Sequence, residues 1–160
     1  MLQKINEMIE MQKALDKAIY GEHNTQFDAE KCRVAMIDEI GELTHELKGN
    51  WCWWKKTQKP VDNEKVLEEL VDIWHFCMSY AYNARSDKKE FNEECYKYRK
   101  RSCNDFKITY SKIVLEFMYS EYSLEYLMIL TEHLGFTIDD VYNAYIKKNK
   151  ENYERLANNY

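Results

Sequence analysis

Two pairs of carboxylates attract attention because each has the three-residue spacing that places both acids on one side of a helix. Glu39 and Glu42 each precede an apolar residue of an amphipathic stretch, so they lie at the edge of its apolar stripe. Glu69 and Asp72 lie inside EELVDIWHF, where apolar residues leave little room for a solvated face. A buried bare carboxylate is costly or takes up a proton unless something compensates its charge.

A divalent cation would compensate these acids. If the two helices pack antiparallel across the short loop between them, four carboxylates meet and repel one another. Mg²⁺ is the economical solution, because it takes hard oxygen ligands and keeps open positions for phosphate and water. Taken alone, the pair at 39 and 42 would indicate a plain solvated face. The pair in the apolar helix favours the metal site.

Helices must position these acids. Apolar residues at near-helical spacing predict three helices in the first half of the chain, over residues 2–20, about 29–48 and about 64–83. Gly21 and Gly49 are expected to end the first two. The third is the most hydrophobic and is expected at the centre of the bundle. Between the second and third lies an ordered aromatic and basic loop, WCWWKKTQKPVDN, with Asp62 or Asn63 as the next N-cap.

The second half of the sequence predicts a C-terminal helix after GFTIDD, with Thr137 as its N-cap and two aspartates in its first turn. Three polar residues of that helix share one face: Lys148, Asn152 and Arg155. Residues 86–106 are charged and weakly patterned, which indicates a helical excursion or a variable insertion. Apolar spacing returns over 108–130.

Composition limits the fold and the function. Four glycines and one proline among 160 residues favour long helices, so we expect one all-α domain over 1–160 with a variable helical insertion around 86–126. A formal charge of −5 argues against a nucleic-acid polymer as partner but not against a small anion. Five cysteines without a C-x-x-C pair indicate reduced thiols. No apolar run approaches the roughly 18 residues of a membrane span, so a cytoplasmic protein is expected.

Three segments carry a resemblance to a known family: EIGELTHELKGNWCWWKK, EELVDIWHF and YIKKNKENYERLANNY, with a weaker EMQKALDKAI near the N-terminus. In this order they resemble the dimeric, all-α dUTPases of the MazG-like NTP pyrophosphatase superfamily, in the small form of bacteria and their phages. The acidic pairs alone would indicate the superfamily only. The resemblance implies hydrolysis of dUTP to dUMP and pyrophosphate by a helical bundle that dimerisation completes.

The resemblance also implies roles for individual residues. More than one Mg²⁺ would bridge the triphosphate, held by Glu39, Glu42, Glu69 and Asp72, and Glu42 would deprotonate the attacking water. The implied substrate contacts are Gln12 and Asp16 for uracil, Trp54 and Phe76 beside the nucleoside, Lys55, and Lys148, Asn152 and Arg155 for phosphate and sugar. Some members carry asparagine where this chain has Asp16. Others carry lysine where it has Cys52, which leaves Lys55 or Lys56 to supply that charge.

Other interpretations stay open. A related pyrophosphatase acting on dCTP or modified nucleotides would use the same acids with a different base pocket. A di-iron carboxylate bundle is suggested by Glu42-x-x-His45 and Asp72-x-x-His75, which have the acid-x-x-His spacing of such sites. That interpretation leaves the tryptophan-rich loop and the C-terminal polar face without a role. A non-catalytic helical protein would use the acids as salt-bridge partners.

Overall fold

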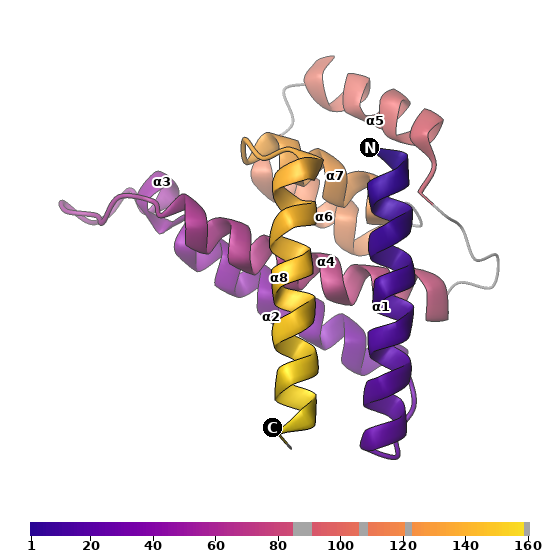
Figure 1. Ribbon diagram of the computed structural model, residues 1–160. Helices are drawn as coiled ribbons and strands as arrows, with labels where there is room; N and C mark the ends of the chain where they lie inside the picture. The colour runs from indigo at the N-terminus through magenta and orange to yellow at the C-terminus, as the bar shows by residue number, and fades with distance from the viewer. Residues whose placement is uncertain (85–90, 106–108, 121–122, 159–160) are drawn as a thin grey trace.

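The computed structural model describes residues 1–84, 91–105, 109–120 and 123–158, and within these ranges the regular structure is entirely helical (Figure 1). The helices are α1 (Leu2–Glu22), α2 (Ala29–Glu46), α3 (Lys48–Trp51), α4 (Asn63–Ala84), α5 (Glu93–Asp105), α6 (Tyr110–Tyr119), α7 (Ser123–His133) and α8 (Ile138–Ala157). The predicted all-α class is confirmed. None of the helices in the described ranges is long and apolar enough to cross a membrane.

Helix α4 lies at the centre of the bundle and contacts α1, α2, α7 and α8. Leu70, Ile73 and Trp74 are among its residues with no exposed surface. The Trp74 indole also donates a hydrogen bond of 3.1 Å to Thr131 Oγ1, which ties α4 to α7. Apolar residues on nearly every side of a helix require such a central position, so the expectation for this helix is confirmed.

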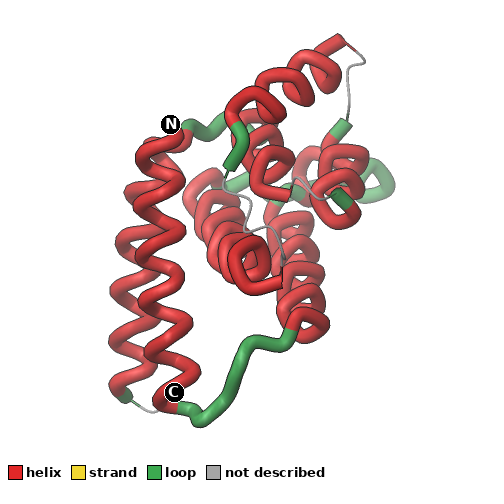
Figure 2. Tube along the Cα trace, turned by 90° about the vertical axis from the view of Figure 1, so that its right-hand side faces the viewer, coloured by secondary structure: helices red, strands yellow, loops and turns green. Residues whose placement is uncertain are grey.

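Two helix pairs position the polar residues of interest. Helices α2 and α4 run antiparallel, since Arg33 bonds to Tyr80 near one end of the pair and Glu39 lies beside Asp72 further along. Helices α1 and α8 lie side by side and run in the same direction, as Figures 1 and 2 show. The α1–α8 pair packs on α4 and therefore brings the first and last helices of the chain against the central helix.

Both predicted glycine stops were wrong. Helix α1 continues through Gly21 to Glu22, and α2 ends at Glu46 with Gly49 inside the short helix α3. A Cβ atom on Gly49 would lie 2.7 Å from the carbonyl oxygen of Lys59. This glycine therefore allows a close approach of the aromatic loop, which spacing along one helix does not reveal.

The helix N-caps and the helices in the second half of the chain agree in part with what the sequence predicts. Asp62 caps α4, because its Oδ1 accepts from the Glu64 amide at 3.1 Å, and Thr137 forms a capping box with Asp140 at the start of α8. Helix α5 lies within the charged stretch 86–106, whereas the apolar stretch 108–130 forms two helices, α6 and α7. Residues 85–90, 106–108 and 121–122 of this region lie outside the described ranges. A single domain with a variable insertion stays a prediction.

Candidate active site

Three of the four predicted acids meet between α2 and α4. One carboxylate oxygen each from Glu39, Glu69 and Asp72 lies within 4.8 Å of the others, and all three residues are half-buried. In the described part of the chain no other group of three His, Cys, Asp or Glu side chains comes this close. Carboxylate oxygens are hard ligands, so this donor set fits Mg²⁺. We call these three residues the acid cluster.

The acid cluster carries more negative charge than its surroundings compensate. Burial raises the pKa of Glu39 to about 7, and the charges of Asp72, Glu42 and Glu69 add to this effect. Burial likewise raises the pKa of Glu69 to about 7, with contributions from Glu42, Asp72 and Glu68. The raised pKa values reflect burial first and repulsion between the neighbouring carboxylates second. A bound divalent cation would relieve that repulsion.

Glu42, the fourth predicted acid, lies at the edge of the acid cluster. Its side chain is exposed and it is not one of the three clustered carboxylates. It is nevertheless close enough to raise the pKa of Glu69 through both its charge and a hydrogen bond. The structure thus places one solvent-facing carboxylate beside three half-buried ones.

Helix α8 brings a lysine to the acid cluster. Lys148 Nζ lies 2.7 Å from Asp72 Oδ2 and 3.6 Å from Glu68 Oε1. Burial raises the pKa of Asp72, and the hydrogen bond from Lys148 and the charge of Arg155 oppose that rise. Both cations lie on the predicted polar face of α8, along with the half-buried Asn152. Glu68 had not been predicted, because it looks like an ordinary surface residue beside Glu69.

Gln12 and Asp16, the residues expected to contact uracil, are buried where α1 meets α4. Gln12 Nε2 donates to Asp16 Oδ1 at 2.7 Å and to Ser79 Oγ at 3.0 Å. Asp16 Oδ2 accepts from Ser79 Oγ at 2.6 Å and from the Tyr82 hydroxyl. Their exposed fractions are only 4% and 5%. Hydrogen bonds within the chain therefore occupy the Asp16 carboxylate.

The oxygen of the Gln12 amide faces two further buried groups. It accepts from the Tyr145 hydroxyl at 2.8 Å and lies 2.7 Å from His75 Nδ1. The His75 ring stacks on Tyr145 with 4.2 Å between centroids. Sequence reasoning missed both as partners of Gln12. The sequence does carry one sign of this polar line: His75 follows Asp72 by three residues and Ser79 follows His75 by four, which places them on one side of α4.

The aromatic loop lies at the far end of the α2–α4 pair, away from α1 and α8 (Figure 1). Trp53 and Trp54 are 87% and 57% exposed and their rings form an edge contact at 5.9 Å. Lys55 is also exposed. Among the described residues no hydrogen bond or ring contact joins Trp54 or Lys55 to the acid cluster. Phe76 is half-buried against the core on α4.

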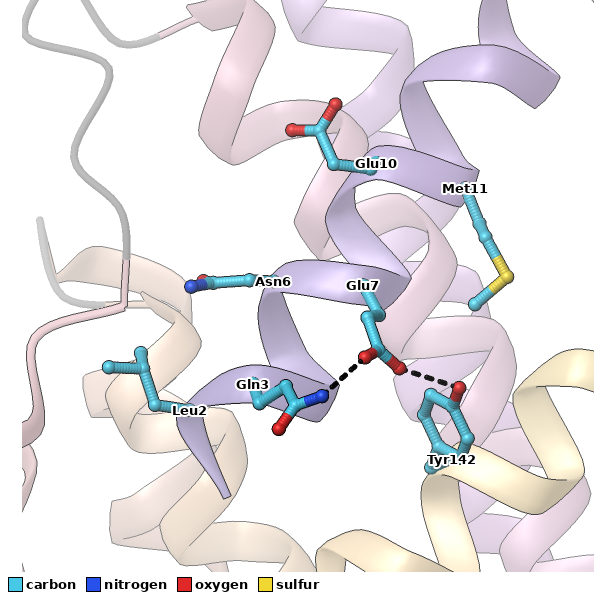
Figure 3. A pocket seen from close by; sticks show the side chains of 7 residues that line it. All are labelled: Leu2, Gln3, Asn6, Glu7, Glu10, Met11 and Tyr142. Atoms are coloured by element: carbon cyan, nitrogen blue, oxygen red, sulfur yellow. Dashed lines mark hydrogen bonds between the residues drawn. The ribbon is translucent and has the colours of Figure 1, made fainter.

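A separate surface pocket lies between the first turns of α1 and Tyr142 of α8 (Figure 3). Glu7 spans it, accepting from Gln3 at 2.9 Å and from the Tyr142 hydroxyl at 2.7 Å. None of the predicted site residues lines this pocket. It is therefore distinct from the acid cluster, and its carboxylate serves to join α1 to α8.

Comparison with known proteins adds one match. A family model described as dUTPase matches residues 4–160, a range that contains the acid cluster, the aromatic loop and the polar face of α8. No curated protein matches the chain.

Proposed function

The chain belongs to the all-helical dUTPase family and is a dUTP diphosphatase, and from this premise we propose that Mg²⁺ held by its acid cluster supports the reaction. The observation that carries the proposal is the meeting of three carboxylate oxygens within 4.8 Å of one another on α2 and α4. These acids come from two helices and are otherwise unfavourably placed. A role in metal binding explains why they are kept together.

Glu39, Glu69 and Asp72 would hold the metal, with Glu42 beside them at the edge. When bound, Mg²⁺ neutralises phosphate charge and makes a water molecule more acidic. Clustered carboxylates also exclude the triphosphate in the absence of a cation, because like charges repel at this distance. The proposal therefore implies that substrate binds together with the metal.

Glu42 is the proposed general base. Its carboxylate faces solvent, so water can reach it, and it lies next to Glu69. A general base must lie within hydrogen-bond reach of the water that it deprotonates. Exposure at the rim of the acid cluster meets this requirement better than the half-buried positions of the other three acids. The proton leaves the water for Glu42 as the new bond to phosphorus forms, the phosphoanhydride bond between the α- and β-phosphates breaks, and pyrophosphate leaves.

The polar face of α8 is proposed to bind the phosphates and sugar. Lys148 already lies at the acid cluster, and the charge of Arg155 reaches Asp72. Arginine offers paired N–H donors that match phosphate oxygens, and lysine supplies a compact positive charge. Asn152 adds an amide on the same face. These groups would hold the triphosphate against the metal and leave the products as dUMP and pyrophosphate.

The aromatic loop supports a homodimer in which each subunit completes the other's site. Trp54 and Lys55 are exposed and do not contact the acid cluster of their own chain in the described ranges. Exposed tryptophans on a projecting loop are typical of surfaces that pack against a partner. We propose that the loop reaches the nucleoside bound by a second copy, where Trp54 packs beside the base and Phe76 lines the pocket from α4.

The di-iron interpretation receives no support from the described residues. His45 is exposed at the end of α2, and His75 is buried with its Nδ1 against the Gln12 oxygen. Neither belongs to the group of side chains that could share an ion. A di-iron site needs both histidines beside the acids.

The decisive test is pyrophosphate release from dUTP, dCTP, dTTP and UTP, each measured with Mg²⁺ and with a chelator. Cleavage confined to dUTP and abolished by the chelator is the expected result. Cleavage centred on dCTP would favour a related pyrophosphatase. Cleavage that persists in chelator would overturn the metal proposal, and iron content measured on the same sample would check the di-iron alternative.

A further inference from the structure

We propose that Asp16 is a positioning residue that sets the polarity of the base pocket: through the Gln12 amide it fixes the tautomer of His75. His75 Nε2 then offers a hydrogen-bond acceptor to the N3–H of uracil, which cytosine lacks. The inference rests on the proposed function for its ligand. Its structural part, the direction of a buried chain of hydrogen bonds, stands on the described contacts alone.

The first step is the orientation of Gln12. Asp16 Oδ2 already takes hydrogen bonds from Ser79 and Tyr82, and Oδ1 faces Gln12 at 2.7 Å. A carboxylate can only accept hydrogen bonds. The group of Gln12 that faces it must therefore be the NH₂ group, whose second hydrogen goes to Ser79 Oγ. The Asp16 carboxylate thus decides which way the amide points.

The second step is the tautomer of His75. With the NH₂ group of Gln12 turned to Asp16, Gln12 Oε1 faces Tyr145 and His75 Nδ1. A carbonyl oxygen only accepts, so His75 Nδ1 must carry a proton. Burial lowers the pKa of His75 to about 3, which keeps the ring neutral with one proton. Nε2 is therefore unprotonated and can accept a hydrogen bond.

The third step is the position of the acceptor atom, His75 Nε2, relative to the proposed substrate. His75 Nε2 is buried and finds no hydrogen-bond partner in the part of the chain that the structure describes. Buried polar atoms without a hydrogen-bond partner are uncommon in folded proteins, and a bound ligand is one explanation for them. His75 follows Asp72 by one turn of α4, on the side that continues to Ser79. A nucleotide with its triphosphate at Asp72 would extend its base along this side.

The ligand group follows from this polarity. Uracil carries a hydrogen on N3, whereas cytosine has a bare acceptor nitrogen at the same position. An unprotonated Nε2 can bond the first and repels the second. A site built to pair with a substrate N–H discriminates strongly against an analogue without it, because its own polar group is left unsatisfied.

Asp16→Asn tests the chain of hydrogen bonds with almost no change in volume. Ser79 and Tyr82 donate to Asp16 in the wild type; with both hydroxyls still donating, the asparagine carbonyl faces them and its NH₂ group turns to Gln12. Gln12 then flips, and His75 Nδ1 becomes an acceptor while Nε2 takes the proton. Long-range ¹H–¹⁵N correlation spectra of the imidazole distinguish the two tautomers. We expect an unprotonated Nε2 in the wild type and a protonated Nε2 in the variant.

Glu7→Gln is the matched control. Like Asp16, Glu7 is a carboxylate of α1 that accepts a hydrogen bond from a tyrosine. Its partner is Tyr142 of α8, at 2.7 Å (Figure 3). The variant removes the same charge from the same helix without touching the buried chain. We expect the ratio of kcat/KM for dUTP to that for dCTP to fall at least about 100-fold in Asp16→Asn and to stay unchanged in Glu7→Gln.

Several results would overturn the proposal. One is a wild-type His75 protonated at Nε2, and another is an unchanged tautomer or unchanged selectivity in folded Asp16→Asn. If that variant does not fold, the wild type still decides, since added dUMP with Mg²⁺ must shift the His75 Nε2 resonance. A wild type that cleaves no dUTP would instead reject the proposed function, whatever tautomer the spectrum shows.

Discussion

Lys148 Nζ lies 2.7 Å from Asp72 Oδ2, so a lysine from the C-terminal helix pairs with a carboxylate of the acid cluster on the central helix. The two side chains are 12% and 17% exposed. A pair this sheltered from water is weakened less by salt than a surface ion pair. Lys148 is therefore an internal counter-cation for a carboxylate that the proposed metal ion would share.

Replacing Lys148 with methionine should change metal binding and stability in opposite directions. Without Mg²⁺ the free energy of unfolding should fall by about 1–2 kcal/mol, since Asp72 loses its partner. Affinity for Mg²⁺ should rise several-fold, because no cation competes for Asp72. Calorimetric titration and thermal unfolding measure the two effects. Lys147→Met is the control, since Lys147 is exposed one position earlier, and equal effects in both variants would contradict the pairing.

Asp72→Asn should abolish turnover and leave the fold intact. The substitution keeps the shape of the side chain but removes the charge that would bind metal, so kcat for dUTP should fall at least about 100-fold. Circular dichroism should show unchanged helix content. Asp38→Asn, at an exposed position of α2 beside Glu39, should retain activity. An active Asp72→Asn enzyme would remove this residue from the proposed site.

Stability without metal should depend on pH through Glu39 and Glu69. Burial raises the pKa of each to about 7 from 4.5. Between these values the folded protein holds more protons than the unfolded chain, so its free energy of unfolding falls as pH rises through this window. Deprotonated carboxylates bind metal, so the increase in Tm caused by Mg²⁺ should grow over the same window. Tm measured from about pH 5 to pH 8, with Mg²⁺ or chelator, checks both slopes.

Glu39→Gln combined with Glu69→Gln is the control for this dependence. Neither glutamine titrates, so the fall in stability across the window should become shallower and the effect of Mg²⁺ should largely disappear. An unchanged slope in the double variant would show that other groups govern the pH dependence.

Mixing two variants, each with a defect in the proposed site, should test whether the site is shared. If the aromatic loop serves the partner subunit, Trp54→Ala and Asp72→Asn place their defects in the same site of a mixed dimer. The other site of that dimer is then intact. Random exchange makes half of the dimers mixed, with one of two sites working, so about a quarter of wild-type activity should return. If the loop serves its own subunit, both sites of a mixed dimer are defective and no activity returns.

Much of the architecture could be predicted because helix faces and caps are local properties. The apolar residues around 70–78 predicted the central position of α4, Thr137 was correct as a helix start, and Asp62 was one of the two candidates given for another. Spacing predicted that four carboxylates of two antiparallel helices would meet; Glu39, Glu69 and Asp72 do so, whereas Glu42 lies at their edge. The prediction that two glycines end helices was wrong. Gly49 instead allows the close approach of a backbone carbonyl from the aromatic loop.

The sequence by itself determined the helical class, the acidic pairs and the polar face of α8, since each depends on periodicity within one helix. Only the tertiary structure decided that Lys148 meets Asp72, and that Gln12 lies between Asp16 and His75. These partners lie up to 76 residues apart in the chain. Their contacts depend on how each helix is rotated about its axis and how far it slides along its neighbour. Packing of the whole core sets both quantities, and no local pattern encodes them.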